Sequence, residues 1–243
     1  MATSKKTKII DWKTTDERFV VFLDIMGFKD FVARNSHDFV YNMMKSLSKS
    51  KKVIEATFLD DELGAEYKTK DIYTTSFSDS IILFSSDDSS LSFEMIITSA
   101  AFFISEAMKN SIPMKGAMAY GTISVDKIQQ IYFGQPLIDA FLLQEEVNYY
   151  GAILHNSVDN YINKNTAKLS KEAKKFLLEK KTPLKSGLMQ HNNINWFRFL
   201  GSDLEDLSKA KKDFEKIVNS LRLVTSGSPR KYIDNTVEFY NSL

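Results

Sequence analysis

Two aspartates stand where strand-like segments end, and their spacing suggests a site for a divalent metal ion. Asp24 closes an apolar run, RFVVFLDI at residues 18–25, that is rich in valine and phenylalanine. Asp79 stands in the polar tripeptide SDS between two further strand-like runs, a pattern typical of a hairpin tip. If these strands are neighbours, both carboxylates project over one edge of the sheet. Two carboxylates and a backbone carbonyl, completed by water and phosphate oxygens, form a common ligand set for Mg²⁺ or Mn²⁺.

Such a metal pair suits phosphoryl chemistry, in which one ion activates the attacking oxygen and the other neutralises a triphosphate. Gly27 lets the backbone approach a phosphate, and the amides of Met26, Gly27 and Phe28 open a predicted helix whose N-terminus favours an anion. Each feature also has a plain structural explanation. Asp24 is equally suited to capping the helix that follows, and Asp79 to being a turn residue. The combination of these features favours the functional interpretation.

Composition excludes several other classes of function. The chain has 243 residues, 43% hydrophobic and 26% charged, which is ordinary for a soluble globular protein. Its 32 basic and 31 acidic side chains give a net charge of +1, which argues against a broad nucleic-acid or anionic membrane surface. Without cysteine there is no disulfide, thiolate catalysis or cysteine-bound zinc, and this suits a reducing cytoplasm. The N-terminus lacks the apolar core of a signal peptide. We therefore expect a cytoplasmic protein with no nucleic acid and no membrane among its partners.

The apolar and polar pattern predicts one sheet with helices packed on it. We expect a strand at 18–25, helices starting near Phe28 and after a cap at Ser36 or Asp38, a loop at 60–70, a hairpin at 71–86, a helix of 93–108 that is buried rather than membrane-spanning, strands at 114–125, 131–133 and 151–157, and a helix at 134–148. Past residue 164 we expect a basic helix over 168–181, two pairing strands at 184–190 and 194–200, and helices over about 203–224 and 229–243.

Several of these motifs together resemble the class III nucleotide cyclases over about residues 16–165. They are, in order, FLDIMGF (22–28), FSDS (77–80), MKGAMAYG (114–121) and FGQPL (133–137). Within that class, the SDS tip, the GAMAYG strand and a closing KYIDNTVEF helix are most similar to the pyrimidine cyclases of bacterial Pycsar antiphage defence. The resemblance implies an α+β fold, with a ferredoxin-like βαββαβ core in a catalytic domain at 16–165. A mostly helical extension would follow at 166–243.

The resemblance also implies an activity and a set of partners. The enzyme would convert UTP or CTP into the 3′,5′-cyclic nucleotide, cUMP or cCMP, and pyrophosphate. It would act as a head-to-tail homodimer with sites at the interface. A separate effector protein would sense the cyclic nucleotide as a second messenger in antiphage defence.

Individual residues take up roles from the same resemblance. Asp24 and Asp79 match the two metal-binding acids, and Ile25 matches the residue whose backbone carbonyl joins them around two Mn²⁺ or Mg²⁺ ions. Lys115 falls where these cyclases usually keep an arginine that contacts the β- and γ-phosphates. Lysine keeps the charge but loses the planar fork of arginine. A solvated strand residue is the plain alternative for Lys115.

The departures from the class bear on the base and on the transition state. Where purine cyclases select the base with a lysine and a polar partner, this chain has Thr75 and Ile131, which disfavours adenylate or guanylate cyclase activity. The asparagine and arginine that stabilise the transition state fall near Ile138 and Leu142, which cannot replace them. Two alternatives therefore stay open: a cyclase-like module that binds nucleotide or a partner without turnover, and a purine cyclase with rewired base contacts.

Four polar residues are the first candidates for transition-state stabilisation or substrate binding in place of those two. They are Asp139, Gln135, Gln144 and Tyr120, although packing on a helix face is the simpler role for at least two of them. The three histidines of the chain show no ligand-like spacing.

Overall fold

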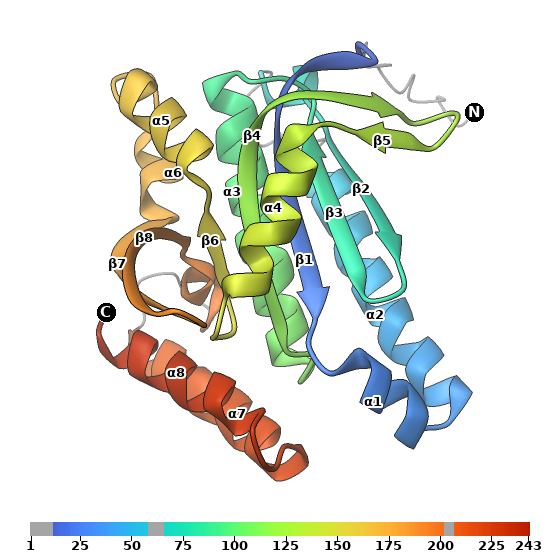
Figure 1. Cartoon of the computed structure of the whole chain (residues 1–243), viewed down its shortest axis with the longest axis vertical. Helices are drawn as coiled ribbons and strands as arrows, with labels where there is room; N and C mark the ends of the chain where they lie inside the picture. Colours follow the sequence, from blue (N-terminus) through green and yellow to red (C-terminus); the bar gives the residue numbers. More distant parts are fainter. Residues whose placement is uncertain (1–11, 58–65, 202–206) are drawn as a thin grey trace, which may run out of the picture.

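The computed structural model describes residues 12–57, 66–201 and 207–243. One mixed eight-stranded sheet runs through the molecule in the order β2-β3-β1-β4-β6-β8-β7, and β5 pairs with β4 as a side arm (Figure 1). The strands are β1 (Thr15–Ile25), β2 (Ile72–Phe77), β3 (Ser80–Ser85), β4 (Met114–Asp126), β5 (Ile131–Phe133), β6 (Ala152–Leu154), β7 (Leu177–Leu184) and β8 (Gly187–Ile194). The helices are α1 (Phe28–Arg34), α2 (His37–Thr57), α3 (Ser90–Lys109), α4 (Gln135–Glu146), α5 (Asn156–Asn165), α6 (Lys171–Lys175), α7 (Leu207–Val224) and α8 (Arg230–Asn241).

Strand β1 is the centre of this architecture. It runs antiparallel to both β3 and β4, and residues Phe19 to Leu23 are buried because helices cover both faces of the sheet. Figure 1 shows α4 in front of the sheet and α2 and α3 behind it. The main core lies on the α3 side, and smaller apolar clusters lie under α4. The predicted α+β class is confirmed: a βαββαβ core carries additional C-terminal helices.

Helix α3 is the buried helix that the sequence predicts. The Ser89 side chain caps it by accepting a hydrogen bond from the amide of Ser92 at 3.2 Å. Its length and composition would allow it to cross a membrane, but 72% of its apolar window is buried inside the protein, as in a core helix. The sequence pattern predicts an apolar face of α2 made of Phe39, Val40, Met43, Met44 and Leu47, and this is only partly correct, because Leu47 is buried whereas Phe39 is 56% exposed. Residues 60–65 of the expected loop lie outside the described part of the chain.

The segment after α5 differs most from expectation. The predicted helix over 168–181 is wrong: α6 ends at Lys175 and β7 begins at Leu177. Strands β7 and β8 form a hairpin that β6 joins to the main sheet, so the predicted pairing of 184–190 with 194–200 is also wrong. At the start of β7, pairing with β8 overrides the helix propensity of the lysine, glutamate and leucine residues. Helix α5 was not predicted, and the domain boundary at residue 165 stays a prediction.

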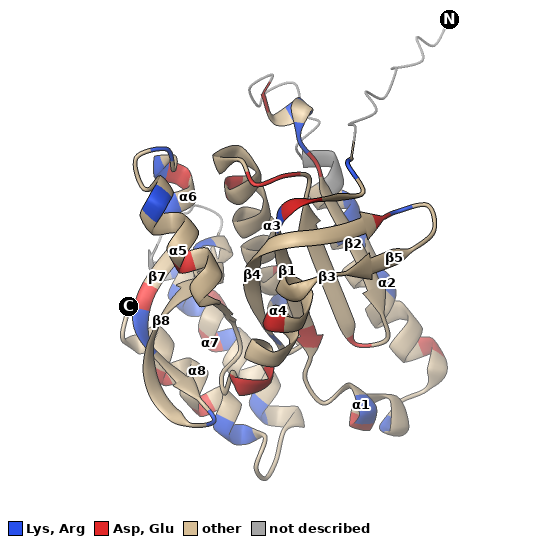
Figure 2. Cartoon of the chain, turned by 45° about the horizontal axis from the view of Figure 1, so that its top comes forward, with Lys and Arg blue, Asp and Glu red and all other residues tan. Residues whose placement is uncertain are grey.

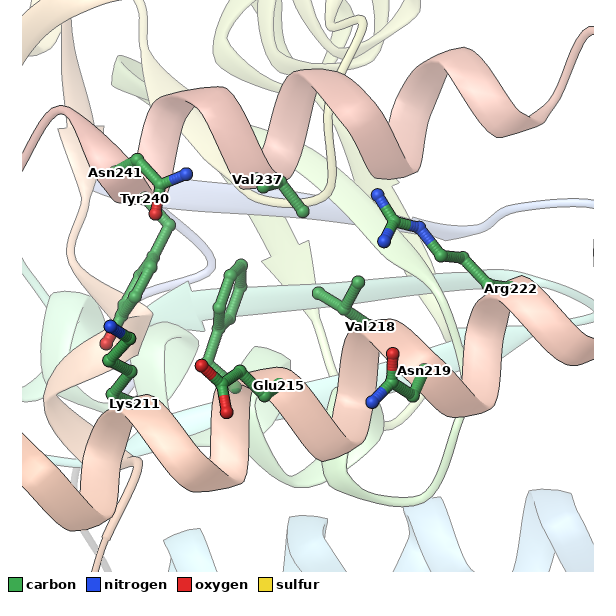
Figure 3. A pocket seen from close by; sticks show the side chains of 9 residues that line it. Lys211, Glu215, Val218, Asn219, Arg222, Val237, Tyr240 and Asn241 are labelled. Atoms are coloured by element: carbon green, nitrogen blue, oxygen red, sulfur yellow. The ribbon is translucent and has the colours of Figure 1, made fainter.

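The two C-terminal helices, which the sequence does predict, pack against each other. The rings of Tyr240 and Phe214 stack with centroids 3.9 Å apart, and the ring of Phe197 lies 5.1 Å from that of Tyr240. A cavity of about 350 Å³ lies between the helices (Figure 3). Its lining residues, all from α7 and α8, are Lys211, Phe214, Glu215, Val218, Asn219, Arg222, Val237, Tyr240 and Asn241.

Asp87, in the turn before α3, makes a testable contribution to stability. Burial raises its pKa, but hydrogen bonds from Lys70, Ser92 and Ser89 outweigh this and lower the pKa to about 2. A carboxylate whose folded-state pKa is depressed stabilises the fold above its unfolded pKa of about 4 and loses that effect as the pH falls towards 2. We expect Asp87→Asn to lower the free energy of unfolding by about 1–2 kcal/mol at pH 7 and by little at pH 2. Urea unfolding across this pH range measures the difference, and an equal loss at both ends would contradict it.

Candidate functional site

Asp24 and Asp79 come together at one end of the three central strands. Asp24 is paired with Ser80 of β3 on one side and with Lys115 of β4 on the other. Asp79 immediately precedes Ser80, and its carbonyl accepts a hydrogen bond from the amide of Ile25 at 3.1 Å. Figure 2 shows acidic residues at the end of β1 and at the neighbouring β2–β3 turn. The expectation that both carboxylates share one edge of the sheet is therefore confirmed by strand pairing.

The segment after β1 distinguishes between the two interpretations of Asp24, as a helix cap or as a metal ligand. Gly27 is the N-cap of α1 with φ of +73°, and no side chain caps that helix. Asp24 is therefore not the helix cap. The amide of Met26 donates to the carbonyl of Pro113 at 2.9 Å, so it is not available to a phosphate. The predicted contacts of Gly27 and Phe28 with phosphate stay predictions.

The electrostatics of Asp24 fit a site for a cation. Burial, followed by the charge of Asp79, raises the pKa of Asp24 to about 6, and Lys115 opposes this only in part. A bound divalent ion would relieve this repulsion between carboxylates. The described residues hold no cluster of three acidic, histidine or cysteine side chains suited to a metal. An ion here would therefore need the carbonyl of Ile25, water and substrate oxygens to complete its shell.

Lys115 is buried beside this acidic pair. It is 4% exposed, so the interpretation as a solvated strand residue is wrong. Its Nζ donates to the carbonyl of Glu145 at 3.4 Å, and burial lowers its pKa against the opposing charges of Glu145 and Asp24. The next residue, Gly116, lies so close to β1 that a Cβ would stand 2.4 Å from the carbonyl oxygen of Phe22. This close approach of β4 to β1 holds Lys115 beside Asp24.

The C-terminal end of α4 adds residues that sequence reasoning largely missed. The Glu145 Oε1 atom accepts a hydrogen bond from Nε2 of the buried Gln144 at 2.9 Å, and its Oε2 lies 3.9 Å from Nζ of Lys185 in the β7–β8 turn. Of these, only Gln144 was a candidate. A signal was available, because two glutamates at the C-terminus of a helix oppose its dipole and so suggest a role other than helix stability.

Asp139 lies elsewhere on the same helix. It precedes Glu145 by six residues, which is about 9 Å along the helix axis. Its carboxylate accepts a hydrogen bond from Gln135 at 2.7 Å and lies 3.9 Å from Nδ1 of His155. Asp139 thus contacts Gln135 and His155, the N-cap of α5, rather than the acidic pair.

Tyr120 is on the opposite face of the sheet from Asp24. Its ring packs 5.0 Å from the ring of Phe19, which belongs to the core under α3. Its hydroxyl donates to Glu17 at 2.8 Å. Within one chain, Tyr120 cannot reach a substrate held at Asp24.

Thr75 and Ile131, the positions of the missing base contacts, are separated in one chain. Thr75 pairs with Ile82, and Ile82 pairs with Phe22, so Thr75 lies level with Phe22, two residues along β1 from Asp24 and on the same face of the sheet. Ile131 pairs with Asp126 at the far end of β4, eleven residues and about 36 Å of strand from Lys115. The two positions could share one substrate only across two chains.

An apolar surface covers α4 and the β4–β5 arm. Its members are large hydrophobic side chains that are at least 45% exposed: Ile128, Ile131, Phe133, Ile138, Phe141 and Leu142. Exposed apolar residues gathered in this way are typical of an interaction surface.

No protein-family model matches the sequence, and no curated protein matches it. The structure, in contrast, is similar to solved guanylyl cyclase domains. The chain has a cyclase-domain fold.

The guanylate cyclase domain of RhGC from Catenaria anguillulae in complex with GTP aligns with a TM-score of 0.52 and 13% identity, covering 75% of this chain and 98% of that one. The non-canonical dimeric guanylyl cyclase domain of RhoGC from Blastocladiella emersonii gives 0.51 and 14%, covering 76% and 97%. The core of a rhodopsin-guanylyl cyclase with converted specificity, in complex with ATPalphaS, gives 0.50 and 15%, covering 75% and 97%.

Because the pKa of Asp24 is raised, we expect Asp24→Asn to stabilise the metal-free protein but to remove the stabilisation that a bound metal ion gives. The carboxylate is disfavoured in the folded state above its unfolded pKa, so Asp24→Asn removes a penalty at pH 7.5. Because Asp24 is partly solvated, we expect a gain in metal-free stability of only about 1 kcal/mol. In thermal unfolding, millimolar Mn²⁺ should raise the Tm of the wild type but not of Asp24→Asn. Equal shifts in both proteins would mean that Asp24 holds no cation.

Proposed function

We propose that this protein is a metal-dependent nucleotide cyclase that converts UTP or CTP into the 3′,5′-cyclic monophosphate and pyrophosphate. The single observation that carries the proposal is the carboxylate pair, Asp24 and Asp79, at one edge of a cyclase-domain fold with Lys115 buried beside it. In this reaction the ribose 3′-oxygen bonds to the α-phosphorus, the bond from that phosphorus to the β-phosphate bridge breaks, and the hydroxyl proton leaves.

Asp24, Asp79 and the carbonyl of Ile25 would hold two divalent ions, Mn²⁺ or Mg²⁺. Support comes from the pKa of Asp24, which burial and then the charge of Asp79 raise, because a buried carboxylate with a like charge nearby is stabilised by a bound cation. Ions held there supply Lewis acidity to the attack of the 3′-hydroxyl and positive charge to the pyrophosphate leaving group.

Lys115 would neutralise the β- and γ-phosphates, assisted by the amides of Gly27 and Phe28. Its burial supports this role, since a desolvated ammonium interacts more strongly with phosphate than one in water. Lysine acts as a point charge and cannot form the bidentate contact of arginine, so the phosphate clamp is looser than in arginine-bearing cyclases.

The choice of a pyrimidine rests on the positions around Thr75. A buried site that lacks hydrogen-bond partners for a purine rejects purines. Thr75 and Ile131 do not replace the lysine and the polar residue with which purine cyclases bind the base. We favour UTP slightly over CTP. Asp139 would act on the substrate of the partner subunit, because its contacts in its own chain lie away from the acidic pair.

We propose further that two copies associate head-to-tail through the apolar surface of α4 and the β4–β5 arm. Its exposed side chains, and the separation of Thr75 from Ile131 within one chain, support interfacial sites. The cyclic nucleotide would be a cytoplasmic second messenger in antiphage defence, sensed by a separate effector protein.

A second candidate function follows from Ile138 and Leu142. These exposed residues stand where cyclases place the asparagine and arginine of the transition state. A module that binds nucleoside triphosphate without turnover would have no need of them. A purine cyclase with rewired base contacts is the third possibility.

The decisive experiment incubates the purified protein with each of the four ribonucleoside triphosphates and Mn²⁺ and resolves the products. We expect cyclic UMP or cyclic CMP together with pyrophosphate. Asp79→Ala should lower the rate at least about a hundredfold, because a metal ligand is lost. Asp159→Ala is the matched control, since Asp159 is a half-buried aspartate of α5 bonded to Asn192 at 2.8 Å.

Each other outcome selects a different function. Cyclic AMP or cyclic GMP as the sole product would exclude the pyrimidine assignment. Bound triphosphate without pyrophosphate release would establish the silent module.

The proposed dimer makes a separate prediction at Leu142, which is 58% exposed on α4. We expect Leu142→Glu to place a charge in the interface, converting dimers to monomers in size-exclusion chromatography with light scattering and abolishing activity. The control is Leu188→Glu, an equally drastic change at a residue of β8 that is 66% exposed. A Leu142→Glu protein that remained dimeric would exclude this surface as the interface.

A further inference from the structure

The C-terminal helix α8 is anchored to the turn that leads from α4 into β6. The Thr236 hydroxyl accepts a hydrogen bond from the amide of Tyr150 at 2.8 Å, and the Asn235 amide donates to the carbonyl of Asn148 at 2.6 Å. The ring of Tyr232 stacks on the ring of Tyr150, with centroids 5.9 Å apart and an angle of 15° between the planes. Three contacts therefore fix the first half of α8 over residues 148–150.

The same turn is joined to the candidate site. The carbonyl of Gly151 accepts a hydrogen bond from the amide of Gly116 at 2.9 Å, and Gly116 adjoins Lys115. On the other side of the turn, the carbonyl of Glu145 accepts from Nζ of Lys115. A short series of direct contacts thus links Tyr232 to Lys115, the strand partner of Asp24, although the two residues are 117 positions apart in the chain.

The hydroxyl of Tyr232 is free to bind a ligand. In the described part of the chain it has no hydrogen-bond partner, whereas the hydroxyls of Tyr149 and Tyr161 are bonded to Asn193 and to the carbonyl of Asp88. Tyr232 is only half buried, so its hydroxyl remains accessible. Burial and then the negative charges of Glu145 and Asp24 raise the pKa of Tyr232, so the phenol stays protonated.

We infer that Tyr232 is a substrate-binding residue whose phenol O–H donates a hydrogen bond to a phosphate oxygen of the triphosphate held at Asp24 and Asp79. This inference rests on the proposed function for the identity of the substrate. A phosphate oxygen is the fitting acceptor because a protonated phenol beside a bound metal–triphosphate is a neutral donor facing concentrated negative charge. Through this contact, the C-terminal extension becomes part of the active site rather than a support for it.

The test compares Tyr232→Phe with Tyr240→Phe. Phenylalanine keeps the ring that stacks on Tyr150 and removes only the hydroxyl. Tyr240 belongs to the same helix but packs on Phe214 of α7, so its substitution is the matched control. We expect Tyr232→Phe to raise the KM for the triphosphate about tenfold, with Tyr240→Phe within twofold of wild type.

Inorganic tripolyphosphate distinguishes a phosphate contact from other roles, because it carries neither base nor ribose. In the presence of Mn²⁺ we expect its inhibition constant to rise in Tyr232→Phe by the same factor as the KM. An unchanged KM, or a raised KM with an unchanged inhibition constant, would overturn the inference.

Failure of the proposed function would give a different result. A wild type that cyclises no nucleotide would refute the cyclase, but binding of Mn²⁺ and tripolyphosphate could still be followed by thermal unfolding. A smaller increase in Tm for Tyr232→Phe than for Tyr240→Phe would then support the phosphate contact alone, and equal increases would exclude it.

Discussion

The rest of this structure depends on one electrostatic constraint, the placement of two carboxylates, Asp24 and Asp79, side by side at the end of a buried strand. Strand β1 has β3 on one side and β4 on the other, so Asp24 cannot swing away from Asp79 without breaking the sheet. The pair is unfavourable by itself, because burial and mutual repulsion raise the pKa of Asp24 to about 6. A fold selected for stability alone would place an apolar residue there. The strands and helices around Asp24 and Asp79 hold these two carboxylates in place.

Strand β4 supplies the positive charge, at a close approach to β1. Gly116 permits that approach, since any side chain would collide with the backbone of Phe22. The same approach buries Lys115 and removes it from water, which strengthens its attraction to the neighbouring carboxylates. Backbone spacing and electrostatics therefore work together at adjacent residues of one strand.

The C-terminal end and the middle of α4 have different roles in this architecture. Its C-terminal end brings Glu145 to Lys115 and, through the following turn, to α8. Its middle presents Ile138 and Leu142 to the outside, where nothing in the described chain covers them. Under the proposed function, a site that used positions as distant as Thr75 and Ile131 would be complete only if a second copy covered this surface. This agreement between an incomplete site and an exposed apolar surface is what favours an interfacial site.

The sequence by itself determined the strand that ends in Asp24, the hairpin tip at Asp79 and the α+β class, because apolar periodicity and turn residues act over short distances. It did not determine the region from 168 to 194, where pairing of β7 with β8 overrides helix propensity. Only the tertiary structure decided that Lys115 is buried beside Glu145, that Tyr120 lies on the opposite face of the sheet from Asp24, and that Tyr232 stacks on Tyr150. These facts depend on strand register and on contacts between residues far apart in the chain, which local sequence does not encode.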